Sequence, residues 1–325
     1  MTFRHFLGRV AATAALIPCL ALAAGKAPAD APAWPRPLPA DADPSKPVLV
    51  LIIDDIGQNL DYGKQALALP GPMTFAFLPQ TPHAVELAKA ARAQGSGLLL
   101  HAPMANQHHY PLGPGGLTLK QNREELQQTL EQDLADLPPV DGVNNHMGSA
   151  LTEDRERMNW VMEILKPRKL YFLDSRTTAA TVATASAFQH QVPWLQRDVF
   201  LDDDKSLKAI AGQLERAATL AKRHGYAIAI GHPYPETLKV LGERLPELRK
   251  EGFRQMSTTQ LLSWLDSATG NTGQPSESAP ALPEPVEPQA PGSQVKRRPP
   301  AVLLCMSPHR QHWQQRSRGY RPQCP

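Results

Sequence analysis

A run of six apolar residues, from Val48 to Ile53, ends in two adjacent carboxylates, Asp54 and Asp55. A continuous apolar run of this length suits a parallel strand that is covered on both faces. Two like charges at the end of such a strand are costly unless a cation or a proton separates their roles. The run therefore predicts a buried parallel strand with a charged site at its carboxyl end.

The two carboxylates are expected to have different roles. In an extended strand the side chains of Asp54 and Asp55 point to opposite faces, so that one can bind a metal while the other serves as a base. An Asp that caps the next helix is the alternative for either residue alone.

Other apolar runs end in titratable residues in the same way. Short runs finish at His101, at Asp174 and at His232. In α/β enzymes the active site is built where the parallel strands end. The repeated pattern therefore predicts one shared site at the carboxyl ends of several strands.

Strand and helix candidates alternate from about residue 47 to residue 266. The strand candidates are 48–54, 73–78, 97–101, 141–145, 169–174, 193–199, 226–231 and 252–256. The helix candidates are 82–94, 120–135, 153–166, 206–224 and 235–249. This alternation predicts an α/β fold with a parallel sheet. Seven or eight units favour a (β/α) barrel, complete or lacking a unit, and an open doubly wound sheet is the alternative.

The two ends of the chain differ in composition from this central region. Arg4 and Arg9 precede an apolar stretch that ends in small residues, so residues 1–24 are predicted to be a cleaved export signal, with a retained membrane anchor as the alternative. Residues 25–46 are expected to be a flexible linker, and residues 267–325 a Pro-rich, disordered tail. The protein is therefore expected to be periplasmic or secreted, with no stable membrane span after cleavage.

Charge and cysteine content exclude some functions. The net charge of +3 falls to +1 without the two arginines of the signal, so there is no general electrostatic case for nucleic-acid binding. The central region contains no cysteine, which excludes a thiol nucleophile there. A metal in this region would need histidine and carboxylate ligands.

Two histidines are candidates for such ligands. His101 ends the third strand candidate, and His146 lies where the fourth passes into a loop. Together with an Asp they offer two nitrogens and one oxygen, a set that leaves a metal open to water. Each alone is also compatible with a hydrogen-bonded core histidine. His108 and His109 lie in a loop bounded by Pro and Gly and are expected at the surface or in a lid.

Charged residues near the later strands are further candidates. Arg197 and Asp198 are expected to orient a site histidine, because carboxylates beside such histidines usually fix the ring. The acidic run 202–204 is expected to be solvated, at the start of a helix. His232 is a candidate proton donor, since imidazole titrates near neutral pH, with a structural histidine as the alternative.

Six ordered motifs extend through the central region. They are Ile53–Gly57, His101–Met104, Asn145–Ser149, Leu173–Thr177, Arg197–Asp202 and Ile230–Pro233. Together they resemble the divergent polysaccharide deacetylase family, which is related to the NodB-type carbohydrate esterases, and the resemblance covers about residues 47–266. It implies a distorted, NodB-like (β/α) barrel with a divalent metal, expected to be zinc, at the strand ends.

The resemblance also implies roles for individual residues. Asp54 would be the base and Asp55 a metal ligand. The relatives take both metal histidines from one His-x-x-x-His turn, whereas here Ala105 stands four places after His101. We therefore expect His146 to be the second histidine ligand, from the geometry of the strand ends.

The expected activity is the removal of N-acetyl groups from an envelope polysaccharide, such as peptidoglycan or another amino-sugar polymer. His232, with Asp174 or Asp198 beside it, would protonate the leaving amine. The residues expected to bind substrate are Asn145, Arg176 and Arg197.

Two other functions compete with this hypothesis. A non-catalytic periplasmic binding or scaffold protein, with partners in the cell envelope, would explain the broken histidine turn and the long tail. A metal-dependent phosphoesterase would favour more Arg and Lys at the strand ends than Arg176 and Arg197 provide.

Overall fold

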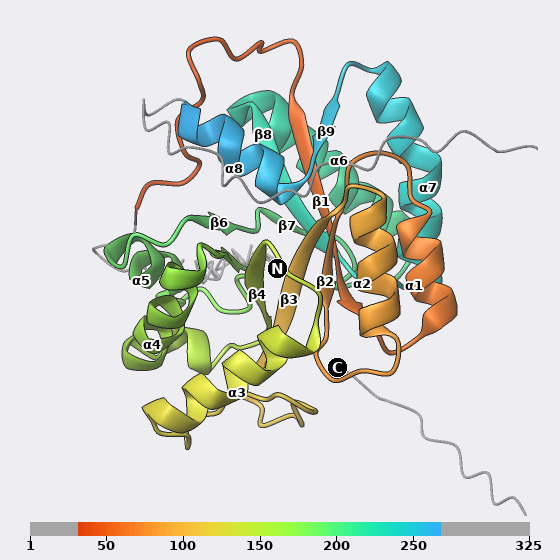
Figure 1. The fold of residues 1–325 in the computed structure, drawn as a ribbon. Helices are drawn as coiled ribbons and strands as arrows, with labels where there is room; N and C mark the ends of the chain where they lie inside the picture. Colours follow the sequence, from red (N-terminus) through yellow and green to blue (C-terminus); the bar gives the residue numbers. More distant parts are fainter. Residues whose placement is uncertain (1–31, 268–325) are drawn as a thin grey trace, which may run out of the picture. The chain divides into compact units, whose positions relative to one another are not determined.

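Parallel strands and intervening helices alternate through the part of the chain that the computed structural model describes, residues 32–267 (Figure 1). The strands are β1 (Val48–Ile56), β2 (Thr74–Phe77), β3 (Gly97–Met104), β4 (Gly142–Met147), β5 (Tyr171–Asp174), β6 (Trp194–Gln196), β7 (Val199–Phe200), β8 (Tyr226–Gly231) and β9 (Arg254–Met256). The helices are α1 (Leu60–Leu67), α2 (Ala84–Ala93), α3 (Arg123–Asp136), α4 (Arg155–Leu165), α5 (Ala183–Gln189), α6 (Leu207–His224), α7 (Pro235–Lys250) and α8 (Thr258–Ser267). The predicted export signal and almost all of the predicted tail lie outside the described residues.

The strands form one curled parallel sheet. Their order is β6-β5-β4-β3-β2-β1-β8-β7, and β9 also pairs with β1. The register of β1 against β8 runs from Val48 opposite Tyr226 to Ile53 opposite Gly231. The two edge strands, β6 and β7, do not pair with each other, so the curled sheet does not close between them. This confirms the predicted distorted (β/α) barrel.

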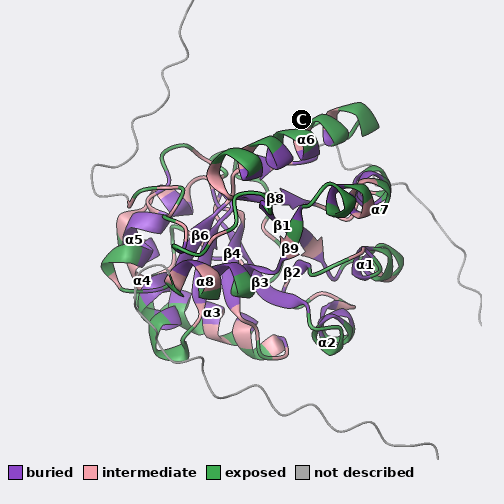
Figure 2. Ribbon diagram, turned by 90° about the horizontal axis from the view of Figure 1, so that it is seen from above, coloured by how far each residue is buried: buried purple, intermediate pink, exposed green. Residues whose placement is uncertain are grey.

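Apolar side chains fill two layers, one on each side of the sheet. Alternate residues of β1 belong to different layers: Val50 packs in the inner cluster, and Leu51 packs in the outer cluster against the helices. Figure 2 shows the buried strands at the centre and the helices around them with their exposed faces outward. The uninterrupted apolar run of β1 follows from this double coverage.

Helix α8 closes the amino-terminal end of the barrel. Its residues Leu261 and Leu265 are buried in the inner cluster. The hydroxyl of Thr258 at its start contacts the hydroxyls of Thr74 and Tyr171, the first residues of β2 and β5. The opposite, carboxyl-terminal end of the strands is therefore left for the site.

Part of the expected flexible linker packs against the barrel. The ring of Trp34 lies 5.5 Å from the rings of both Trp194 and Tyr226, and its indole nitrogen donates to Asp198 at 2.6 Å. Arg36 pairs with Asp266 at 2.6 Å. Trp34 therefore bridges β6 and β8 beside the unpaired ends of the sheet.

No helix within residues 32–267 combines the length and the apolar character that a membrane crossing needs.

Candidate active site

The end of β1 brings both predicted carboxylates to one place. The pairing of β1 with β2 slips between Ile53 and Ile56, and Asp55 has a left-handed backbone with φ of 58°. Such a conformation costs a non-glycine residue about 1 kcal/mol or more and is concentrated at functional sites. As a result the side chains of Asp54 and Asp55 both reach His101, at 3.6 and 3.2 Å. The alternation expected for an extended strand does not hold at this point.

Asp55, His101 and His146 converge on one small space. Oδ1 of Asp55 lies 2.9 Å from Nδ1 of His146 and 3.2 Å from Nε2 of His101, and the two ring nitrogens are 3.2 Å apart. Within residues 32–267 these three form the group of His, Cys, Asp or Glu side chains whose spacing suits a metal ion. In a tetrahedral zinc site with bonds of about 2.0–2.1 Å, neighbouring ligand atoms lie about 3.3 Å apart. The observed triangle is within a few tenths of an ångström of that arrangement.

Hydrogen bonding supports a metal at this triangle. Oδ1 of Asp55 is buried and accepts no hydrogen bond of good geometry, although two ring nitrogens face it. His101 uses its other nitrogen, Nδ1, to donate to Oδ1 of Asn144 at 2.8 Å, which leaves Nε2 as the ring nitrogen that faces the site and would bind a cation there. Asn144 in turn donates to Asp54 at 3.0 Å. The residues present therefore fit a divalent cation, and Asn144 was not predicted from the sequence.

The two carboxylates differ in their protonation. Burial raises the pKa of Asp54, and the attraction of His101 and His232 reduces this effect without cancelling it. Burial would also raise the pKa of Asp55, but the imidazoles of His101 and His146 that face it hold that pKa well below its usual range. Asp55 therefore remains anionic, as a ligand requires, while Asp54 takes up a proton more readily.

His232 is held at the end of β8 by a buried carboxylate. Its ring Nδ1 and its backbone nitrogen donate to the two oxygens of Asp202, at 2.9 and 2.6 Å, and Thr237 donates to Asp202 at 2.7 Å. Its other ring nitrogen, Nε2, lies 3.9 Å from Oδ2 of Asp55. Burial lowers the pKa of His232, but the bond to Asp202 and the charge of Asp55 outweigh burial and raise it to about 9.

This arrangement corrects two predictions. The acidic run was expected to be solvated, but Asp202 is only 2% exposed because three donors draw it inward. Asp174 or Asp198 was expected to pair with His232. Instead, Asp198 accepts from Trp34 and from the backbone of Ile228, and Asp202 takes the place at the histidine.

Asp174 has a different position from the one predicted. It is fully buried and accepts hydrogen bonds from the backbone nitrogen of Arg176 and the hydroxyl of Thr181, at 2.8 and 2.9 Å. Burial raises its pKa, and the hydrogen bond from Arg176 opposes this effect. Asp174 therefore fixes the loop after β5 and does not contact His232.

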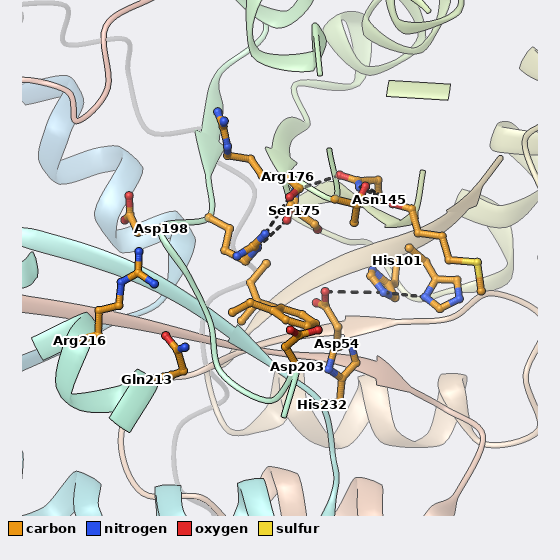
Figure 3. A pocket seen from close by; sticks show the side chains of 16 residues that line it. Asp54, His101, Asn145, Ser175, Arg176, Asp198, Asp203, Gln213, Arg216 and His232 are labelled. Atoms are coloured by element: carbon orange, nitrogen blue, oxygen red, sulfur yellow. Dashed lines mark hydrogen bonds and ion pairs between the residues drawn. The ribbon is translucent and has the colours of Figure 1, made fainter. Parts of the chain in front are cut away.

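The three predicted substrate-binding residues all line one cavity of about 610 Å³. Asn145 ties β4 to β5, because its side chain accepts from the backbone of Ser175 and donates to the carbonyl of Met147. Arg197 donates to the carbonyls of Ser175 and Arg176 at 2.6 and 2.8 Å. Figure 3 shows His101 and Asp54 on one side of this cavity and Arg216 and Gln213 on the other. The sequence pattern gave no signal for the last two, which come from α6.

The loop histidines do not belong to the group of Asp55, His101 and His146. His108 and His109 are exposed, and the ring of His108 lies 5.5 Å from that of Tyr110. This confirms their expected surface position.

Comparisons with known proteins agree with this geometry. A family model described as "Divergent polysaccharide deacetylase" matches residues 51–262, more than half of the chain. The uncharacterized protein YibQ of Escherichia coli K12 is 38% identical over 200 residues, which cover 62% of this chain and 63% of YibQ. An uncharacterized protein of Haemophilus influenzae is 35% identical over 203 residues, which cover 62% of this chain and 72% of that protein. The chain thus spans somewhat less than two thirds of the length of YibQ.

A solved structure shares the fold. The uncharacterized protein ATU2773 of Agrobacterium tumefaciens C58 superposes with a TM-score of 0.64 at 22% identity, over 70% of this chain and 99% of that one.

Proposed function

Because the chain belongs to the divergent polysaccharide deacetylase family, we propose that it is a metal-dependent hydrolase that removes N-acetyl groups from an amino-sugar polysaccharide. The observation that carries this proposal is the triangle of Asp55, His101 and His146 at the strand ends, with Asp54 and His232 beside it. A facial set of two imidazoles and one carboxylate leaves coordination positions open for water and substrate.

Asp55, His101 and His146 would hold the cation. A divalent ion there, with zinc as the expected one, would supply polarisation of the acetamide carbonyl and a lower pKa for water. Asp54 lies on the same side of β1, with one oxygen 3.6 Å from Nε2 of His101 and the other bound to Asn144. From this position Asp54 takes the proton of the attacking water.

His232 faces the same space from β8. Its Nδ1 is bound to Asp202, so that only Nε2 can exchange a proton with the substrate. That atom lies 3.9 Å from Asp55 and thus close to where the acetamide would be bound. His232 gives a proton to the nitrogen of the amide as the C–N bond breaks, and the products are acetate and the free amine.

The setting of this activity is also part of the proposal. The predicted export signal supports a substrate in the cell envelope, such as peptidoglycan or another amino-sugar polymer. Protein partners in the envelope remain a further expectation.

Acetate release tests the proposal. Zinc-loaded protein should release acetate from N-acetylated amino-sugar oligomers, whereas Asp55→Ala and His146→Ala should lose zinc and activity together. His108→Ala serves as the matched control, because this histidine is exposed. Zinc binding with no acetate release from any envelope glycan would contradict the hydrolase and favour the alternative function, a non-catalytic binding protein.

A further inference from the structure

Three arginines from different elements line the part of the cavity away from the metal ligands. Arg176 follows β5, Arg197 lies between β6 and β7, and Arg216 is on α6. Figure 3 shows Arg176 and Arg216 across the cavity from His101. The proposed deacetylation does not use these guanidinium groups, so their presence in the cavity needs another explanation.

Arg197 is held by groups that do not neutralise its charge. Its guanidinium donates to two backbone carbonyls, those of Ser175 and Arg176, and lies 5.1 Å from the centre of the Phe200 ring. Burial lowers its pKa, and the attraction of Asp174 does not restore it. A half-buried cation whose hydrogen-bond partners are neutral carbonyls favours an anionic ligand beside it.

Arg176 is placed next to Arg197 at a cost to its backbone. Its φ of 49° is left-handed, and the backbone nitrogen is fixed by Asp174 at 2.8 Å. Its guanidinium has a long contact of 3.3 Å with the neutral side chain of Gln196. Strained residues of this kind are concentrated at binding sites.

The acidic residues on this side do not balance the three arginines. Within residues 32–267 no carboxylate lies within 4.0 Å of their guanidinium nitrogens. Both oxygens of Asp198 are occupied by Trp34 and Ile228. The exposed Asp203 is the remaining carboxylate on this side of the cavity lining. Asp198 keeps its charge because both donors are neutral, so three arginines face two carboxylates, Asp198 and Asp203, in the lining on this side, an excess of one positive charge.

We propose that this arginine side of the cavity, formed by Arg176, Arg197 and Arg216, binds an oxyanion substituent of the polysaccharide, a carboxylate or a phosphate. The inference rests on the proposed function, because it places the substituent on the same polymer whose acetamide lies at the metal ligands. Guanidinium groups match carboxylate and phosphate with two parallel hydrogen bonds.

Phe200 separates this subsite from the reacting centre. Its ring contacts the guanidinium of Arg197 and also packs edge-on against the ring of His232, with centres 5.4 Å apart. The acetamide and the oxyanion would therefore lie on different sides of Phe200. The substrate class that follows is an acetylated glycan that carries its own negative charge.

Calorimetric titration of the zinc-loaded full chain tests the inference. Three oligosaccharides of equal length are compared: N-acetylglucosamine units only, alternate units with a lactyl carboxylate, and units phosphorylated at position 6. Since hydrogen bonds between two charged groups are stronger than those between neutral groups, at least one anionic oligomer should bind about tenfold more tightly than the neutral one, which corresponds to about 1.4 kcal/mol. A preference for the carboxylate or for the phosphate identifies the group, and either result supports the subsite.

Two variants assign the preference to these arginines. Arg216→Gln and Arg176→Gln should each reduce the anionic preference severalfold, more than they change the affinity for the neutral oligomer. Arg223→Gln, at an exposed position of the same helix α6 outside the cavity, should keep the preference. Equal affinity for all three oligomers, or a preference unchanged in both variants, would overturn the inference.

Acetate release on the same oligomers separates this inference from the proposed function. Anionic preference without acetate release would contradict the hydrolase and leave the subsite intact. Acetate release with equal affinities would contradict the subsite and leave the hydrolase intact.

Discussion

His232 donates both its backbone N–H and its ring Nδ1–H to the carboxylate of Asp202. One buried carboxylate thus fixes the position of the histidine at the end of β8 and the nitrogen that carries its inner proton. The other ring nitrogen, Nε2, is left to face Asp55, which is the orientation that the proposed proton transfer needs.

We predict that Asp202→Asn lowers kcat about 10- to 100-fold, because the ring of His232 loses the negative charge that orients it and stabilises its protonated form. The pKa of His232, raised to about 9 in the intact site, should fall without this carboxylate. Since the protonated form is the active one, the decline of activity at alkaline pH should begin at lower pH. A pH–rate profile measures this shift.

Asp204→Asn is the control for that prediction, because this nearby residue is exposed and lies outside the lining of the cavity. A profile for Asp202→Asn that coincides with that of the wild type would contradict the assigned role.

We predict that Asn144→Ala weakens zinc binding about 10- to 100-fold. Without the Asn144 oxygen, nothing described in the structure fixes the proton of His101 on Nδ1, and Nε2 no longer presents its lone pair at all times. Competition with a chromophoric chelator measures the affinity. Asn59→Ala, at the amino-terminal cap of α1, is a matched change that should leave zinc affinity unaltered. Equal loss in both variants would show a general folding defect.

We predict that Trp34→Ala destabilises the barrel by about 2–3 kcal/mol, because it removes ring packing and the hydrogen bond to Asp198. Trp34→Phe keeps most of the packing and should cost about 1 kcal/mol. Urea denaturation measures both values. Two variants as stable as the wild type would mean that this segment does not support the barrel.

We predict that stability decreases as pH rises from about 4 to 7 because of Asp133. Burial raises the pKa of this carboxyl to about 7, and one of its oxygens has no hydrogen-bond partner. Between the unfolded pKa of about 4 and the folded pKa of this carboxyl, the native state binds more protons than the unfolded state. The stabilisation that comes from the protonated carboxyl is therefore complete below pH 4 and is lost as the pH rises through 7. The loss amounts to a few kcal/mol, at about 1.4 kcal/mol for each pKa unit.

Asp133→Asn should remove this dependence and be more stable than the wild type at pH 8. Urea denaturation at pH 5 and pH 8 provides the comparison. The same difference between variant and wild type at both pH values would exclude Asp133 as the cause.

The strands were predictable because apolar runs bounded by polar residues mark buried parallel strands, and β1 is buried over its whole apolar run. The predicted strand 193–199 is divided into β6 and β7, since the chain changes its pairing partner there: the backbone nitrogen of Arg197 donates to Asp174 of β5, and that of Asp198 donates to Ile228 of β8. Helix α5 was missed because five of its seven residues are buried, which leaves no alternation of polar and apolar faces.

The site was predictable as far as it depends on strand ends. Parallel strands bring their carboxyl ends to one edge, so Asp55, His101 and His146 meet there. The inward turn of Asp202 was not predictable, because an acidic run shows no pattern that separates a buried member from its solvated neighbours. The left-handed turn at Asp55 depends on the slip between β1 and β2, which is a tertiary feature.

Titration of zinc into metal-free protein, with acetate release followed on an N-acetylated amino-sugar oligomer, measures whether Asp55, His101 and His146 hold a catalytic ion. We expect that release rises with zinc and saturates at one ion per chain, and that Asp55→Ala neither binds the ion nor releases acetate. Acetate release that does not depend on the metal, or zinc bound with full affinity by Asp55→Ala, would contradict this expectation.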